Sequence, residues 1–284
     1  MSELIVITMS NVTSADGTRI ACTRAGSGPP VVLVDGALSH RARSINAGLA
    51  TALASRFTVY TYDRRGRGES GGTPPSTPST PSTPSTPFAP EREVEDLAAV
   101  VAEAGGPVRL YGTSSGAAVA LAAAHSGVPV ERLALYEPPF IVDATRPPVP
   151  GDYLRTLDDL VAAGRRAEAV RYFMRVGVGL PGIVVAMMRF MPAWSSLKAL
   201  AHTLPYDAAF VAPYELGRPY PASSWASVKA PTLVMDGGKS PSWIRNAAAA
   251  LAEHLPEATY RTLDGQTHIV KPAALAPVLE GFFR

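Results

Sequence analysis

The chain has 284 residues, with 26 Lys or Arg against 24 Asp or Glu, and 46% of its residues are hydrophobic. This length can bury a sizeable core without a metal or a disulfide, and the composition argues against general disorder. The near-balance of charges, with no cluster of Lys and Arg on a predicted helix, makes nucleic-acid binding a poor first hypothesis. The single cysteine, Cys22, excludes an internal disulfide and a cysteine-based zinc site. The N-terminus has no basic leader, and the most apolar later stretch, 176–188, is interrupted by glycine and proline. We therefore expect a cytoplasmic protein with neither a signal peptide nor a membrane span.

Strand-like and helix-like segments alternate along most of the chain. Short β-branched runs bounded by Pro, Gly or Asp predict strands at 18–23, 31–34, 57–62, 108–111, 132–136, 232–235 and 259–263. Helical patterns lie at 45–55, 90–104, 115–125, 241–255 and 272–283. This alternation is typical of βαβ units, so we predict an α/β fold with a mainly parallel sheet flanked by helices, and an antiparallel first strand.

Two segments depart from this alternation. Residues 73–90 contain four tandem Ser-Thr-Pro triplets, which predict an extended loop insertion because proline removes backbone donors and restricts the residue before it. Residues 138–229 show no clear strand and several proline-punctuated helical pieces. They stand between two late strands, above the carboxyl edge where open α/β sheets bind ligands. We predict a core of residues 1–137 and 230–284, with 138–229 as a helical lid, or cap.

A possible nucleophile lies between a predicted strand and a predicted helix. Gly112, Ser114 and Gly116 complete the pattern G-x-S-x-G, in which serine occupies a sharp turn and glycines allow strand and helix to approach. The backbone N–H of Ser115, at the start of the helix, would point at a developing oxyanion. His268 follows the last predicted strand and is the histidine best placed to act as general base.

Together these segments resemble the α/β-hydrolase fold superfamily, in its serine hydrolase type, over nearly the whole chain. The resemblance rests on VLVDGALSH, YDRRGRGES, the serine turn, LALYEPPF, PTLVMDGG and GQTHIV. It implies an oxyanion hole made by the backbone N–H groups of Ala37 and Ser115. The chain has Asp35 before Gly36, where the family usually has histidine.

The sequence offers more than one catalytic acid, because no carboxylate stands at the family's usual position after PTLVMDGG. Glu137, directly after the preceding strand, matches the position of a glutamate acid in haloalkane-dehalogenase-like members, and we favour it. Asp236, in the last residues of its strand, is the alternative acid. A Ser-His dyad, or a different acid, is the third possibility.

These features predict a serine hydrolase, carboxylesterase-like, that cleaves an ester, thioester or lactone through an acyl-enzyme, with no metal and no cofactor. The substrate we expect is a small molecule with an apolar acyl or aromatic group, bound by lid residues such as Phe173 and Trp194. The same site could instead serve a C–C bond hydrolase, a perhydrolase or a lyase, or the chain could be a non-catalytic ligand-binding member of the fold. We expect no nucleic-acid or membrane partner, and the sequence leaves the oligomeric state open.

Overall fold

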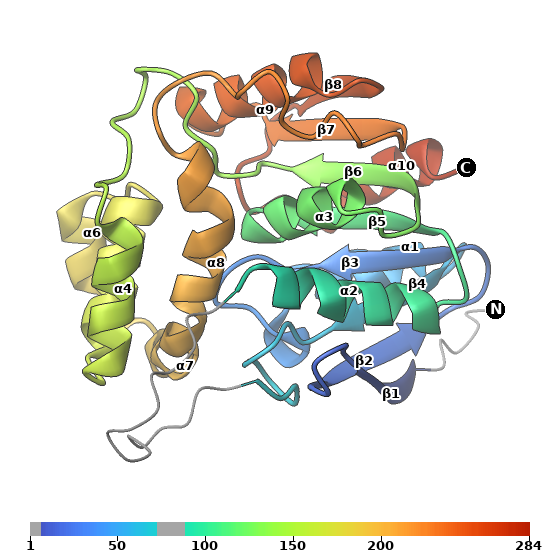
Figure 1. Ribbon diagram of the computed structural model, residues 1–284, viewed down its shortest axis with the longest axis horizontal. Coiled ribbons are helices and arrows are strands. Elements are labelled where there is room, and N and C mark those ends of the chain that lie inside the picture. The colour runs from blue at the N-terminus through green and yellow to red at the C-terminus, as the bar shows by residue number, and fades with distance from the viewer. Residues whose placement is uncertain (1–6, 73–88) are drawn as a thin grey trace.

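The computed structural model describes residues 7–72 and 89–284, so the Ser-Thr-Pro triplets of the predicted loop insertion lie outside the described residues. Its centre is an eight-stranded sheet in the order β1-β2-β4-β3-β5-β6-β7-β8 (Figure 1). The strands are β1 (Ile7–Thr13), β2 (Arg19–Ala25), β3 (Pro30–Val34), β4 (Thr58–Tyr62), β5 (Val108–Thr113), β6 (Val130–Tyr136), β7 (Thr232–Gly237) and β8 (Ala258–Leu263). From β4 to β8 all neighbours are parallel, while β2 is antiparallel to both β1 and β4. The expected mainly parallel sheet is therefore confirmed.

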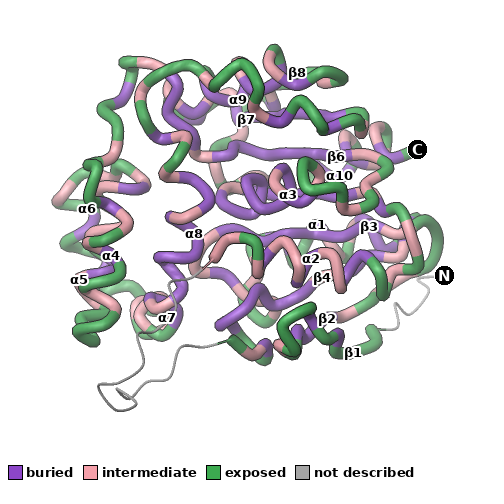
Figure 2. Tube along the Cα trace, viewed as in Figure 1, coloured by how far each residue is buried: buried purple, intermediate pink, exposed green. Residues whose placement is uncertain are grey.

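Helices cover both faces of this sheet (Figure 1). They are α1 (Ala47–Leu53), α2 (Glu91–Glu103), α3 (Ser115–His125), α9 (Ser242–His254) and α10 (Pro272–Phe282). Leucine, valine and alanine side chains of α2, α3 and α9 form one hydrophobic core with one face of the strands. Those of α1 and α10 form a second core with the opposite face. Burial on both faces explains why the central strands are continuous apolar runs rather than alternating ones (Figure 2).

Between β6 and β7 the described chain forms helices only, and we call residues 138–229 the helical insertion. Its α-helices are α4 (Tyr153–Ala162), α5 (Arg166–Tyr172), α6 (Gly182–Met187), α7 (Trp194–Leu200) and α8 (Leu204–Val211). Short 3-10 helices lie at Arg41–Arg43, Met188–Phe190, Ala201–Thr203 and Ala212–Tyr214, and a π-helical turn lies at Phe173–Gly177. In Figure 1 the insertion stands beyond the carboxyl ends of the parallel strands, with α8 nearest the sheet. The insertion therefore borders the edge at which Ser114 lies.

No single helix in the described part of the chain is long and apolar enough to cross a bilayer. By length and composition alone, the bent pair Gly182–Phe190 and Trp194–Tyr214 meets that criterion jointly, with a bend of 105°.

Candidate active site

Ser114 occupies the sharp turn that joins β5 to α3. Its backbone has φ 55° and ψ −130°, a conformation that costs a residue with a Cβ roughly 1–3 kcal/mol. The turn is held because the Ser114 N–H donates to the Tyr136 carbonyl at 2.9 Å and the Ser114 carbonyl accepts from Ala117 at 2.9 Å. This strained turn, which the two hydrogen bonds maintain, places the Ser114 side chain where β5 and α3 meet.

The two glycines of the pattern are needed for packing. A Cβ on Gly116 would lie 2.4 Å from the Val34 carbonyl oxygen, and one on Gly112 would lie 2.4 Å from the Gly116 carbonyl oxygen. Both distances are shorter than any real Cβ contact, so only glycine lets α3 lie against β3 and β5 here. The sequence-based explanation of these glycines as points of close approach agrees with this packing.

The loop after β3 passes beside the serine. A Cβ on Gly36 would lie 3.0 Å from the Cβ and 3.6 Å from the Oγ of Ser114, so the Gly36–Ala37 peptide adjoins the Ser114 side chain. Asp35, which replaces the usual histidine, is buried and turned into the loop. Its carboxyl accepts from Ser39, Ser44 and Asn46 at 2.6–2.9 Å, and burial raises its pKa despite these bonds. Asp35 therefore braces the loop after β3 through three side-chain hydrogen bonds.

Glu137 and His268 meet directly. Glu137 follows β6, has a positive φ of 48° and is fully buried. Its Oε2 lies 2.7 Å from His268 Nδ1, and its Oε1 accepts the Gly237 N–H at 2.7 Å. The histidine side chain is 36% exposed. Both carboxylate oxygens are thus occupied, one fixing the carboxylate to β7 and the other holding the imidazole.

Asp236, the alternative acid, is oriented elsewhere. Its side chain is fully buried, its Oδ2 accepts from the Tyr260 hydroxyl, and the same oxygen lies 3.8 Å from Arg245 Nε. Burial raises the pKa of this carboxyl. The partners of Asp236 therefore belong to β8 and α9, and the structure brings Glu137, rather than Asp236, to His268.

The model of the family described as "Alpha/beta hydrolase family" matches residues 31–278. The chain belongs to the alpha/beta hydrolase family. An alpha/beta hydrolase from Sphaerobacter thermophilus is 53% identical, with 97% of this chain and 100% of that chain covered and a TM-score of 0.85. No curated protein matches the sequence significantly.

More distant solved structures share the fold. A thermophilic esterase from Thermogutta terrifontis is 22% identical, with 96% of this chain and 97% of that chain covered and a TM-score of 0.63. The 2-hydroxy-6-oxo-6-phenylhexa-2,4-dienoate hydrolase from Rhodococcus is 19% identical, with coverage of 99% and 100% and a TM-score of 0.63. The expected superfamily and α/β-hydrolase fold are confirmed, and family and neighbours together support a hydrolase.

A buried charge cluster lies behind the serine of this hydrolase, and sequence reasoning missed it. Arg64 and Arg67, in the turn after β4, meet Glu93 of α2 and Asp207 of α8, and all four side chains are at most 2% exposed. Asp207 is the only acidic residue between Glu168 and Glu215, in an otherwise apolar helix. A lone acid in such a segment was the available signal, because an ionised carboxylate is buried only beside a cation.

The predicted substrate contacts lie in the helical insertion. Phe173 and Trp194 are partly buried and pack on an apolar cluster that includes Tyr153 and Leu157. Leu38, which follows Ala37, packs on the same cluster. The cluster therefore joins the insertion to the loop beside Ser114, and substrate contact by Phe173 and Trp194 stays a prediction.

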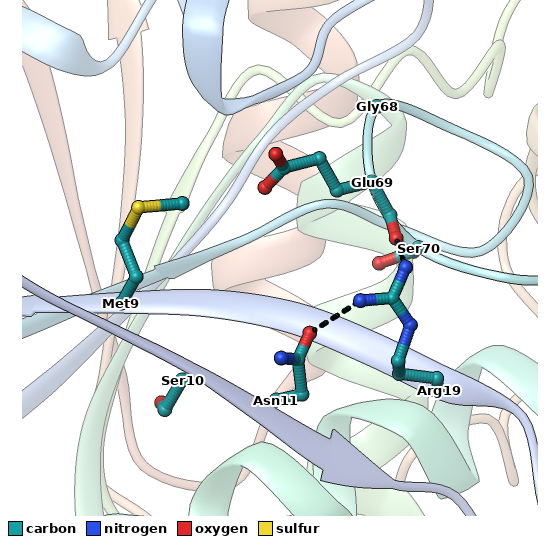
Figure 3. A pocket seen from close by; sticks show the side chains of 7 residues that line it. All are labelled: Met9, Ser10, Asn11, Arg19, Gly68, Glu69 and Ser70. Carbon is teal, nitrogen blue, oxygen red and sulfur yellow. Dashed lines mark hydrogen bonds between the residues drawn. The ribbon is translucent and has the colours of Figure 1, made fainter.

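Two surface pockets lie away from the serine. One, of about 500 Å³, is lined by β1, β2 and residues 68–70, where Arg19 donates to Asn11 at 3.0 Å (Figure 3). The other, of about 550 Å³, lies between α5 and α7. Neither is lined by Ser114, Glu137 or His268. Within residues 7–72 and 89–284, no group of three His, Cys, Asp or Glu side chains is placed to hold a metal ion.

Proposed function

We propose that this protein is a serine hydrolase that cleaves a carboxylic ester, thioester or lactone through a covalent acyl-enzyme. Ser114 is the nucleophile, His268 the general base, and Glu137 the acid that orients the base. The observation that carries the proposal is the 2.7 Å contact between His268 Nδ1 and the buried carboxylate of Glu137. A carboxylate only accepts, so Nδ1 carries the proton and Nε2 is left free to take one.

In the acylation step, Ser114 Oγ attacks the substrate carbonyl carbon while its proton moves to His268 Nε2. The carbonyl π electrons become an oxyanion, which the N–H groups of Ala37 and Ser115 stabilise. Within the described ranges no hydrogen bond uses either N–H, so both donors are free for this role. The tetrahedral intermediate then collapses: the bond to the leaving oxygen or sulfur breaks, and His268 returns its proton to that atom.

Deacylation repeats these steps with water. His268 Nε2 takes a proton from a water molecule whose oxygen attacks the acyl carbon. Collapse of the second intermediate breaks the bond to Ser114 Oγ, which recovers its proton from His268. The products are a carboxylic acid and, from the first step, an alcohol or thiol; a lactone gives both groups in one molecule.

The helical insertion supplies the proposed substrate specificity. Its apolar cluster meets the loop beside Ser114 through Leu38, which favours a substrate with an apolar acyl or aromatic group. In this proposal the insertion acts as a lid over the carboxyl edge of the sheet, and Phe173 and Trp194 contribute to the cleft. The substrate is thus a small molecule, and the reaction needs no cofactor.

The test is intact mass spectrometry after treatment with a fluorophosphonate, which phosphonylates activated serines. We expect one adduct on the wild type, none on Ser114→Ala, and an unchanged adduct on Ser126→Ala, an exposed serine at the far end of α3. A panel of esters, thioesters and lactones then identifies the bond that is cleaved.

An unlabelled wild type, or an adduct that persists in Ser114→Ala, would refute the activated serine. Labelling without turnover of any panel member would instead favour the alternatives of C–C bond hydrolysis, perhydrolysis or a lyase reaction on the same serine. Tight ligand binding that Ser114→Ala leaves unchanged, without labelling, would indicate a binding protein.

A further inference from the structure

We infer that Asp207, supplied by the helical insertion, is a positioning residue for the oxyanion hole. This inference rests on the proposed function and adds to it a residue from outside the α/β core. Asp207 touches none of the proposed reacting atoms. It acts through the two backbone N–H groups proposed to stabilise the oxyanion, those of Ala37 and Ser115.

The first line of contact runs to Ser115. The Ser115 hydroxyl donates to Asp207 Oδ1 at 2.7 Å and accepts from Arg64 Nη1 at 3.2 Å. Arg64 Nη1 also donates to Asp207 Oδ1, at 2.8 Å. The Ser115 side chain is therefore held by two hydrogen bonds. Ser115 is the first residue of α3, so no preceding helical turn fixes its position.

The second line runs to Ala37 through one peptide unit. Arg67 Nη2 donates to Asp207 Oδ2 at 2.7 Å, and Arg67 Nη1 donates to the Gly36 carbonyl at 2.7 Å. The Gly36 carbonyl and the Ala37 N–H belong to the same planar peptide and point in opposite directions. Whatever fixes the carbonyl therefore fixes the direction of the N–H. Asp207 orients the guanidinium that does so.

The charge balance makes Asp207 indispensable to this arrangement. Arg64 and Arg67 carry two buried positive charges, and Glu93 and Asp207 carry the two negative charges in contact with them. Arg64 contacts both acids, whereas Asp207 is the acid that Arg67 contacts. Burial alone would raise the pKa of Asp207, but Arg67 and Arg64 outweigh it and hold that pKa below its ordinary value. Asp207 is thus an anion whose loss leaves one buried cation unpaired.

The experiment compares the full-length wild type with Asp207→Asn and with the double variant Asp207→Asn/Arg67→Met. The double variant removes one charge of each sign, leaving Arg64 paired with Glu93, but does not restore the bond to the Gly36 carbonyl. Two quantities are measured for each protein: the midpoint of urea unfolding, and the fluorophosphonate reaction resolved into the maximal rate of labelling and the half-saturating concentration. A misplaced oxyanion hole lowers the maximal rate, whereas a damaged binding cleft raises the half-saturating concentration.

We expect Asp207→Asn to lower both the unfolding midpoint and the maximal labelling rate, the latter at least tenfold, with less than a threefold change in half-saturation. In the double variant we expect most of the midpoint to return while the labelling rate stays low. Recovery of the labelling rate to within threefold of wild type would overturn the inference, because Asp207 would then serve stability alone.

Arg67→Lys covers the case in which Asp207→Asn does not fold. Lysine keeps the buried charge but lacks the planar fork that bonds Asp207 and the Gly36 carbonyl together. We expect a folded protein with at least a fivefold slower maximal rate, and an unchanged rate would overturn the inference. An unlabelled wild type would overturn the proposed function itself, and the inference with it; wild-type labelling that none of these variants alters would overturn the inference alone.

Discussion

Replacing Glu137 by glutamine should nearly abolish turnover while leaving the fold in place. Glutamine has almost the shape of glutamate, but one of its two terminal atoms is an NH₂ donor. The Gly237 N–H donates to Glu137 Oε1, so the glutamine oxygen must occupy that position and its NH₂ must face His268 Nδ1. That donor forces Nδ1 to accept and moves the ring proton to Nε2, the atom that takes the proton of Ser114 in the proposed mechanism.

The magnitude follows from the geometry. A carboxylate and an imidazolium whose atoms are 2.7 Å apart interact by about 6 kcal/mol at an effective dielectric constant of 20. The imidazole is 36% exposed, so solvent screening reduces this to roughly 3–4 kcal/mol. At about 1.4 kcal/mol per tenfold, the loss of charge alone slows the chemical step by roughly 10²–10³. The wrong tautomer adds to this, and the loss of about 10⁴ in kcat on the equivalent change in serine proteases sets the upper end.

The assay is kcat for an ester found in the panel, or the maximal labelling rate, for wild type and Glu137→Gln. Asp236→Asn is the matched control: it also exchanges a buried carboxylate for an amide, on the strand next to Glu137, but its partners are Tyr260 and Arg245. We expect it to stay within threefold of wild type. A Glu137→Gln variant within tenfold of wild type, or an Asp236→Asn variant as slow as Glu137→Gln, would refute the reasoning.

Three further changes have distinct expected results. Gly116→Ala should destabilise the fold by more than about 2 kcal/mol because its Cβ would lie 2.4 Å from a backbone oxygen, whereas Gly281→Ala, with nothing within 4 Å, should be neutral or stabilising in the same urea titration. Burial raises the pKa of Glu215 to about 8 from 4.5. At a pH between these two values the Glu215 carboxyl is ionised in the unfolded chain but protonated in the native state, so the free energy of unfolding falls as the pH rises. The free energy of unfolding of Glu215→Gln should therefore rise relative to that of the wild type between pH 5 and pH 8, by up to about 5 kcal/mol. A stability difference between the two proteins that does not change with pH would contradict this. Tyr136→Phe removes a 2.6 Å bond to the backbone carbonyl before His268; we expect roughly 1 kcal/mol lower stability and a several-fold lower kcat, and an unaltered kcat would show that this bond does not hold the histidine.

Hydrophobic pattern and turn chemistry sufficed for most of the fold. Every predicted strand and core helix corresponds to an observed one, because a buried parallel strand needs a continuous apolar run and the sequence contains few others. One observed strand, β1, has no predicted counterpart. Of its seven residues only Val12 is buried, so β1 lacks the run of apolar residues that marks the central strands.

The site was predictable where a motif fixes the local geometry and was not where orientation decides. The serine turn has a sequence signature, so Ser114 could be located directly. The choice between Glu137, after β6, and Asp236, in β7, could not be settled from the sequence. Successive side chains of a strand point to opposite faces of the sheet, so an error of one position at a strand end changes which of the two acids is expected to face His268. Asp207 escaped prediction for a different reason: its partners are distant in sequence, and no local pattern shows which cations a buried acid will meet.

The pairing of Arg64 with Asp207 joins residues 143 positions apart in the chain. During synthesis the turn after β4, the serine turn and β6 all leave the ribosome before the acid that neutralises Arg67 has been made. A chain ending before α8 has to keep Arg67 in water or bury it unpaired, and either course holds open the region between β3, β4 and α3. Neutralisation of the charge cluster behind Ser114 therefore requires a chain that extends through α8, so this part of the structure is completed late in synthesis.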